Sequence, residues 1–148
     1  MKALASYFAA AFLMLAVTAN AQDVRKEIGA AKFDQAVANL LVALDSRNPG
    51  LTRSAIYILG DFKAEKAVIP LMAALRNSAD ERTRIAAAYA LCKIGQGIGT
   101  YAVKQAVRFD DSEKVKMHSA WYFNLLVSSG TFAFIPTETN GTIVAENR

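Results

Sequence analysis

The chain has 148 residues, with 17 Lys and Arg against 13 Asp and Glu, and it contains one Cys and one His. This length fits a single domain, since domains commonly hold about 100–150 residues. An apolar content of 53% excludes a disordered chain, and a lone Cys excludes a disulfide scaffold or a zinc site built from Cys pairs. The formal net charge is only +4, and acidic residues are interleaved with the basic ones, so nucleic acid is not an expected partner.

The first 21 residues have the composition of a cleaved secretory signal peptide. Lys2 supplies a positive start, residues 3–18 are almost wholly apolar, and Ala19-Asn20-Ala21 is a small-x-small cleavage pattern. A membrane-spanning helix is the weaker interpretation, because a span needs about 20 apolar residues with an anchor beyond them. Cleavage before Gln22 leaves a mature chain of net charge +3 without a stable membrane span. We therefore expect a soluble, periplasmic or secreted protein.

Helical signals follow one another along the rest of the chain. Asp34, Asp80 and Ser112 are suitable N-caps, and Pro70 falls in a first turn, where its missing N–H costs little. Together with the apolar periodicity, they predict helices near 34–46, 51–62, 66–77, 80–95, 100–109 and 112–127, with a short one near 23–31.

Apolar residues recur every 32 residues through these segments. The recurring triplets are Tyr57–Tyr89–Trp121, Leu59–Leu91–Phe123 and Phe62–Ile94–Leu126. Residues 37–44 and 68–75 also match, each with apolar side chains at i, i+3, i+4 and i+7, which is one face of a helix. Matching faces at a fixed period predict an all-α fold, a short α-solenoid or superhelix of about three antiparallel helix pairs.

The C-terminal segment has a different character. Helical periodicity stops at Ser128, and Asn140-Gly141 is a candidate hairpin turn between β-branched and aromatic residues. Residues 128–148 are therefore expected to form an irregular tail, either as a cap over the last repeat or without order.

The central unit resembles a HEAT-like repeat. Residues 67–75 (AVIPLMAAL) and 83–95 (TRIAAAYALCKIG) are similar to the short bacterial, phycobilisome-lyase type, A-x-P-x-L-x-x-L followed by an acidic turn and V-R-x-x-A-A-x-A-L-G-x-I-G. Cys92 stands where that pattern has Gly, and the spacing from Arg53 to Gly60 is one residue short of it. The resemblance covers about residues 33–127 and implies one HEAT-like domain over 22–127. It also implies a structural ladder between neighbouring repeats, to which we assign Asp80, Arg84 and Lys116.

Aromatic residues are the best candidates for a binding surface. Tyr57, Tyr89 and Trp121 share one variable position of the second helix, which the resemblance places on the inner, concave face. Tyr and Trp are enriched at interface hot spots, because they bury large areas with few rotatable bonds. We predict Tyr57, Tyr89, Lys93 and Trp121 as partner-binding residues, with Asp61 helping Lys93 to set orientation. The alternative is that the rings pack between helices or that residues 121–123 cap the open end.

Residues for chemistry are few, and no catalytic residue, metal or cofactor is predicted. Cys92 is expected to be a buried apolar residue and His118 a partly exposed surface residue. The glycine-rich segment 95–100 follows a predicted helix rather than a strand, which indicates a connection and not a phosphate-binding loop.

The sequence therefore favours an exported, non-catalytic HEAT-repeat module for a protein or peptide partner, and the identity of that partner and the oligomeric state stay open. One alternative is a lyase-like or ligand-carrying protein of the phycobilisome-lyase type. The other is a structural fragment that assembles into a longer solenoid, with a seam at Ile98, Tyr101 and Val103 or at the tail.

Overall fold

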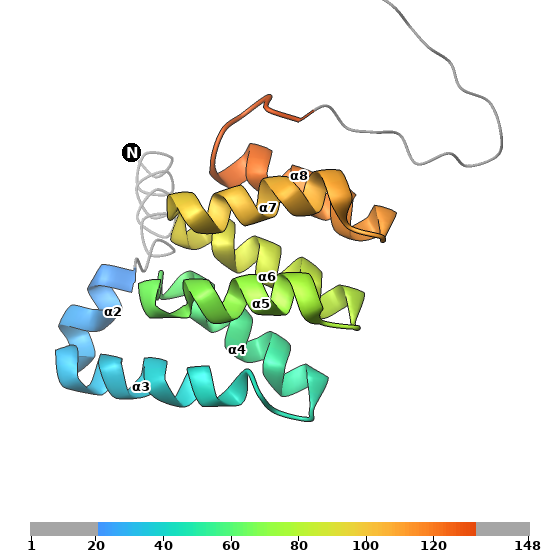
Figure 1. The fold of residues 1–148 in the computed structure, drawn as a ribbon. Coiled ribbons are helices and arrows are strands. Elements are labelled where there is room, and N and C mark those ends of the chain that lie inside the picture. The colour runs from blue at the N-terminus through green and yellow to red at the C-terminus, as the bar shows by residue number, and fades with distance from the viewer. Residues whose placement is uncertain (1–20, 133–148) are drawn as a thin grey trace, which may run out of the picture.

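The computed structural model describes residues 21–132, and this part of the chain consists of helices joined by short turns, without a strand (Figure 1). The elements in chain order are α2 (Ala21–Ile28), α3 (Ala30–Ala43), α4 (Pro49–Asp61), the 3-10 helix η2 (Glu65–Ala67), α5 (Val68–Asn77), α6 (Glu81–Ile94), α7 (Gly97–Phe109) and α8 (Glu113–Leu126). None of the helices in this range is long and apolar enough to cross a membrane.

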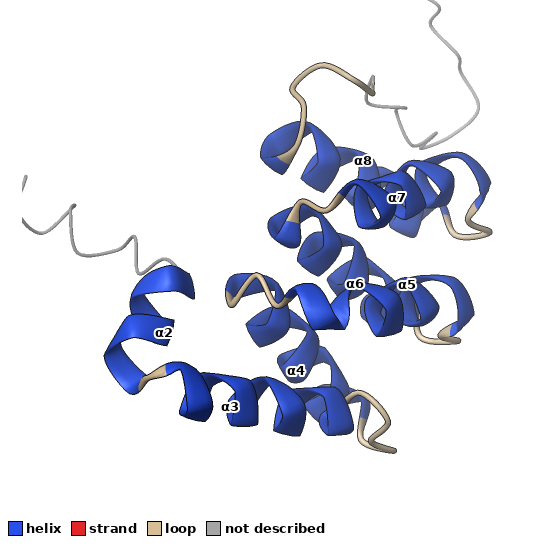
Figure 2. Cartoon of the chain, turned by 60° about the vertical axis from the view of Figure 1, so that its left-hand side comes forward, coloured by secondary structure: helices blue, strands red, loops and turns tan. Residues whose placement is uncertain are grey.

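The helices form three antiparallel pairs that stack in one direction. The pairs α3–α4, α5–α6 and α7–α8 place their second members α4, α6 and α8 side by side, and α5 lies beside α7 (Figures 1 and 2). The short helix α2 folds against α3 at the first end of the stack. The predicted all-α solenoid of about three helix pairs is confirmed.

The second helix of each pair begins at a side-chain cap, and the three caps are 32 residues apart. Asn48 accepts from the backbone N–H of Gly50 at 2.9 Å, Asp80 from that of Arg82 at 3.3 Å, and Ser112 from that of Val115 at 3.4 Å. Each cap satisfies an N–H that has no partner within its helix. The expected caps Asp80 and Ser112 are confirmed.

The expected cap Asp34 is wrong. Helix α3 already begins at Ala30, and Asp34 lies exposed within it. The chain turns from α2 into α3 at Gly29, whose φ of +84° is in the region that glycine adopts without a steric penalty. The glycine therefore sets this boundary, although it carries no side chain that could cap the helix.

The 32-residue register also holds within the core. Leu59, Leu91 and Phe123 occupy one position of successive second helices and are at most 2% exposed. Gly60 packs so closely against α6 that a Cβ there would lie 2.8 Å from the Cα of Ala90. Gly60 and Cys92 are therefore equivalent, and the missing residue near Arg53 is absorbed in the first turns of α4.

Residues 128–132 fold back over the last helix pair. The ring of Phe132 lies edge-on against that of Phe123, with centroids 5.4 Å apart. Asn124 donates to the carbonyl of Phe132 at 2.6 Å and accepts from its N–H at 3.0 Å. Asn124 holds the position of Gly60 and Cys92, so a polar side chain replaces a packed one where no further pair follows. The predicted cleavage segment up to Asn20 and the hairpin turn at 140–141 lie outside the described residues.

Candidate functional site

Four aromatic rings from three successive second helices form a continuous cluster, which we call the aromatic row. Tyr57 of α4 lies 5.4 Å from Tyr89 of α6, measured between ring centroids, and Tyr89 lies 5.3 Å from Tyr122 of α8. Trp121 adjoins Tyr122 at 5.0 Å. The stacking of the pairs thus brings together three predicted residues that are 32 positions apart in the chain.

The ends of the aromatic row are its most exposed parts. Tyr57 and Trp121 are 40% and 43% exposed, whereas Tyr89 and Tyr122 are half-buried between them. The row is therefore neither core nor a set of isolated surface rings. It presents two accessible rings on a foundation that neighbouring helices hold in place.

Tyr122 is the member that sequence reasoning missed. Its equivalents at the 32-residue spacing are Ile58 and Ala90, so no aromatic series pointed to it. The adjacent pair Trp121-Tyr122 was the available signal, because successive helical positions lie about 100° apart and two such rings cover a wide face. In the structure Tyr122, and not Trp121, contacts Tyr89.

A polar group closes the α4–α6 side of the row. The hydroxyl of Tyr89 donates to Asp61 Oδ1 at 3.0 Å, and Lys93 Nζ lies 3.4 Å from the same oxygen. Lys93 Nζ also lies 5.7 Å from the centroid of the Tyr89 ring. Burial and the Asp61 hydrogen bond raise the pKa of Tyr89, so its hydroxyl remains a neutral donor.

The charge of Lys93 is set by opposing influences. Burial lowers its pKa, but Tyr89 and Asp61 outweigh burial, so the pKa is raised and the ammonium group stays charged. The predicted residues Lys93 and Asp61 are thus brought together with Tyr89, and they give the row one fixed polar edge.

An ion-pair ladder links the turns of successive repeats. Arg53 of α4 reaches Asp80, the cap of α6, with a contact of 2.7 Å. Arg84 of α6 reaches Asp110, just before α8, through Nε and Nη2, each at 3.1 Å from a carboxylate oxygen. Asp80 and Arg84 therefore belong to two different rungs, each of which joins neighbouring repeats.

Lys116 takes no part in this ladder. It pairs with Glu113 within α8 at 2.7 Å, because no repeat follows α8 to supply an acidic turn. The sequence also missed Arg53 and Asp110 as partners. The one-residue offset in α4 moved Arg53 out of register with Arg84, and Asp110 precedes the helix cap rather than forming it.

The residues considered for chemistry are placed as follows. Cys92 is 2% exposed, and burial raises the pKa of its thiol to about 12, so it is not an activated nucleophile. His118 is half-buried with its ring 6.3 Å from that of Tyr122. Within residues 21–132, no group of three His, Cys, Asp or Glu side chains could hold a metal ion. Gly95 and Gly97 connect α6 to α7, as expected for a link between repeats.

The model of the HEAT-repeat family matches residues 16–92, which is just over half of the chain. With three stacked helix pairs and this match, the chain belongs to the HEAT-repeat family. Proteins built from HEAT repeats are commonly protein-interaction modules, and the family is generally non-catalytic. No curated protein matches the sequence.

Proposed function

We propose that this protein is an exported, non-catalytic HEAT-repeat module that holds a protein or peptide partner against the aromatic row, on the inner face of the solenoid. The observation that carries the proposal is the row itself, with four touching rings from three helices and the outermost rings about two-fifths exposed.

The surroundings of the row resemble the anatomy of an interface. Ile58 beside Tyr57 is 40% exposed and Leu125 beyond Trp121 is 61% exposed, which extends the apolar area at both ends. Interfaces combine an aromatic centre with a polar rim, and rim charges orient a partner more than they hold it. The pair Asp61–Lys93 supplies such a rim at one edge.

Assembly into a longer solenoid is the second candidate, and two observations weigh against it. Ile98 and Tyr101 are more than half exposed, but Val103 of the proposed seam is completely buried within the single chain. Phe132 already covers Phe123 at the open end. End-to-end stacking would first have to displace residues 128–132.

The test is capture of a partner from periplasmic extract, followed by mass spectrometry. The matched baits are the parent protein, Tyr57→Ala/Trp121→Ala and Tyr101→Ala/Phe109→Ala. The second pair removes aromatic rings that are 61% and 73% exposed on α7, in the other helix layer. We expect one reproducible protein that is lost with the first double variant and kept with the second.

Equal loss with both variants, or an empty eluate from folded bait, would overturn the aromatic row as the binding surface. Two further measurements address the remaining parts of the proposal. Cell fractionation with N-terminal sequencing should find a periplasmic chain that begins at Gln22. An absorption spectrum with a visible band would favour the ligand-carrying alternative.

A further inference from the structure

A separate cavity of about 420 Å³ lies at the first end of the stack, away from the aromatic row. Small-molecule sites commonly occupy about 300–1,000 Å³. The lining comes from α2, α3, the end of α4, η2 and the end of α6, and consists of Arg25, Phe33, Asp34, Val37, Phe62, Lys63, Ala64, Glu65, Lys66 and Ile94.

The inner part of the cavity is apolar. Phe33 and Phe62 lie with ring centroids 5.2 Å apart, and Val37 and Ala64 are at most 5% exposed. Ile94 completes this floor from α6. The floor is thus shielded from bulk water yet faces a hollow, which suits the apolar body of a small ligand.

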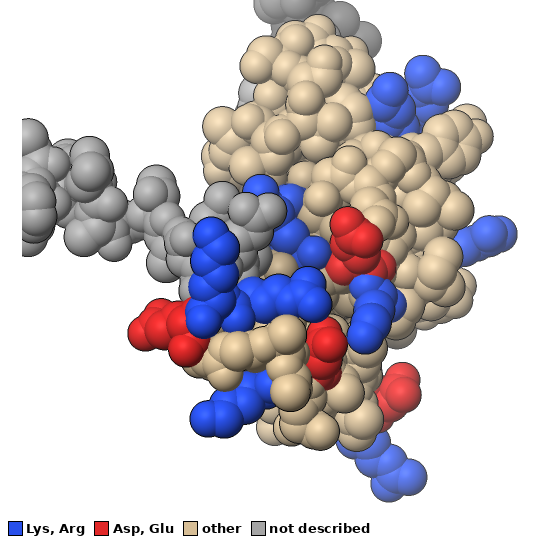
Figure 3. Space-filling view, turned by 90° about the vertical axis from the view of Figure 1, so that its left-hand side faces the viewer, with Lys and Arg blue, Asp and Glu red and all other residues tan. Residues whose placement is uncertain are grey.

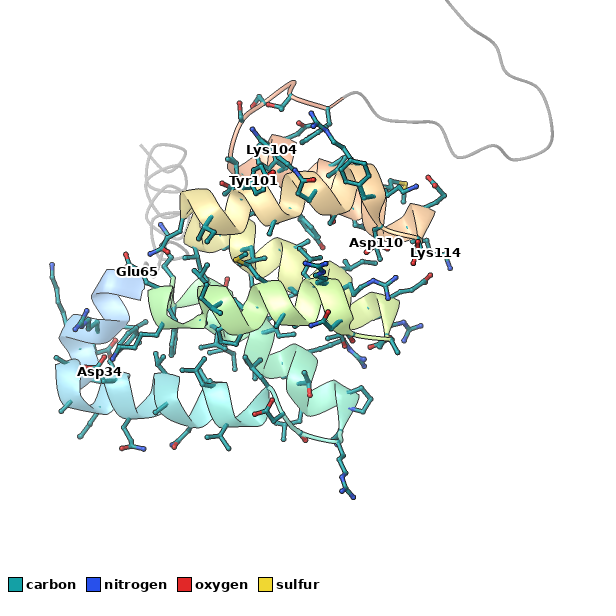
Figure 4. The ribbon with its side chains drawn as sticks, viewed as in Figure 1. Asp34, Glu65, Tyr101, Lys104, Asp110 and Lys114 are labelled. Carbon is teal, nitrogen blue, oxygen red and sulfur yellow. The ribbon has the colours of Figure 1, made fainter. Side chains whose placement is uncertain are left out.

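Basic groups dominate the rim. Arg25, Lys63 and Lys66 line the cavity against Asp34 and Glu65, which leaves one excess positive charge. Of the three basic residues, only Lys66 has an ion-pair partner among residues 21–132, and that contact to Asp34 is long at 3.9 Å. Figure 3 views this end of the molecule, where basic side chains gather, and Figure 4 labels Asp34 on α3 and Glu65 on η2.

Lys63 has an unusual backbone conformation for its residue type. It follows α4 with a φ of +47°, and its N–H and that of Ala64 bond back to Gly60 and Leu59. This is the C-terminal helix motif in which glycine is preferred, since a side chain costs about 1–2 kcal/mol in the left-handed region. The equivalent position 32 residues later is Gly95, with a φ of +75°. A lysine therefore stands at the cavity mouth where the sister repeat has the unstrained residue.

We propose that this cavity is a binding site for a small amphipathic anion with one acidic head group and an apolar body, as in a medium-chain carboxylate. The head group sits among Lys63, Arg25 and Lys66, and the apolar body lies on Phe33, Phe62 and Val37. The strained backbone at Lys63 places a cation at the mouth of an apolar cavity, where glycine would give a better helix end and no charge.

The test is an NMR titration of the purified protein with octanoate, and with octan-1-ol as its uncharged match. We expect octanoate to shift the amides of Lys63 and Ala64 and the methyl groups of Val37 in a saturable way. Octan-1-ol should bind several-fold more weakly at the same site. Equal binding of the two, or shifts at the aromatic row instead of the cavity, would overturn the proposal.

Four variants separate a binding role from a folding role. Lys63→Gln should weaken octanoate about fivefold, as expected for an exposed charge pair, and leave octan-1-ol unchanged, whereas Lys63→Arg should retain binding. Glu65→Gln should tighten octanoate, because it removes a like charge from the rim. Lys63→Gly should bind more weakly while melting no lower than the parent. If Lys63→Gln or Lys63→Gly binds octanoate as the parent does, Lys63 has no role in binding and the proposal fails.

Discussion

The two interfaces between successive repeats are held together in different ways. Between α4 and α6 the backbones approach closely at Gly60 and Ala90, and the ladder rung Arg53–Asp80 is a single contact with side chains 26% and 38% exposed. Between α6 and α8 the larger Cys92 replaces Gly60, and the rung Arg84–Asp110 is bidentate with side chains 13% and 9% exposed. The first interface therefore depends on packing, and the second depends on a shielded ion pair.

The largest effect is expected at the shielded rung. Arg84→Ala should lower the free energy of unfolding by about 3 kcal/mol, since it leaves Asp110 almost buried without its partner. It also removes the hydrogen bond from Nη1 to the carbonyl of Ser78 at 2.8 Å. Urea denaturation checks this value, with Lys116→Ala as the control, because the pair Lys116–Glu113 lies within one helix and is exposed on one side. A loss as small as that of Lys116→Ala would contradict the proposed difference between the interfaces.

The close approach at the first interface gives the next effect. Gly60→Ala should cost about 2 kcal/mol, because the new Cβ would lie 2.8 Å from a backbone atom that cannot move aside alone. Gly97→Ala is the matched control, since nothing lies within 4 Å of a Cβ at that position. Equal melting temperatures for the two variants would show that α4 and α6 can separate without cost.

The sequence predicted what depends on periodicity and failed where a boundary or contact depends on neighbouring chain segments. The 32-residue spacing was enough for the three helix pairs and for the meeting of Tyr57 with Tyr89. Asp34 was mistaken for a cap because a competing signal, Gly29, acts through backbone freedom rather than through a side chain.

The partners in contacts between repeats were harder to predict. Tyr122 contacts Tyr89 only because of the way α6 and α8 cross, and the rung Arg53–Asp80 spans an offset that the repeat pattern does not contain. The cavity beside Lys63 combines five elements, so no local pattern announces it.

A smaller effect, of opposite sign, is expected inside α8. The hydroxyl of Ser119 is completely buried and has no hydrogen-bond partner among the described residues, whereas the equivalent positions in α4 and α6 are Ala55 and Ala87. Ser119→Ala should therefore raise the free energy of unfolding by about 1 kcal/mol, because it removes an unsatisfied polar group and restores the residue of the sister repeats. Thermal and urea unfolding check the sign. A destabilised variant would mean that the hydroxyl has a partner.

The smallest effect concerns the exposed rung and depends on pH. The pKa of Asp80 is held below 3.8 by a hydrogen bond from Thr83 and, despite some desolvation, by Arg53 and the backbone N–H of Arg82. A carboxylate with a lowered pKa stabilises the fold at neutral pH, and this contribution is lost as the pH falls through the folded-state value. Arg53→Ala should cost less than about 1 kcal/mol at neutral pH, as for exposed ion pairs, since the Thr83 and Arg82 contacts remain.

The same difference between parent and Arg53→Ala should shrink once the pH drops below 3.8, where Asp80 begins to take up its proton and no longer attracts Arg53. Urea midpoints of both proteins at neutral pH and across this acidic range measure it. A difference that stays constant with pH would assign the stabilisation to packing of the Arg53 side chain, and the two interfaces would then differ in packing alone at this position. A difference that vanishes with acid would leave the ion pair as the cause and keep the contrast with the shielded rung at Arg84.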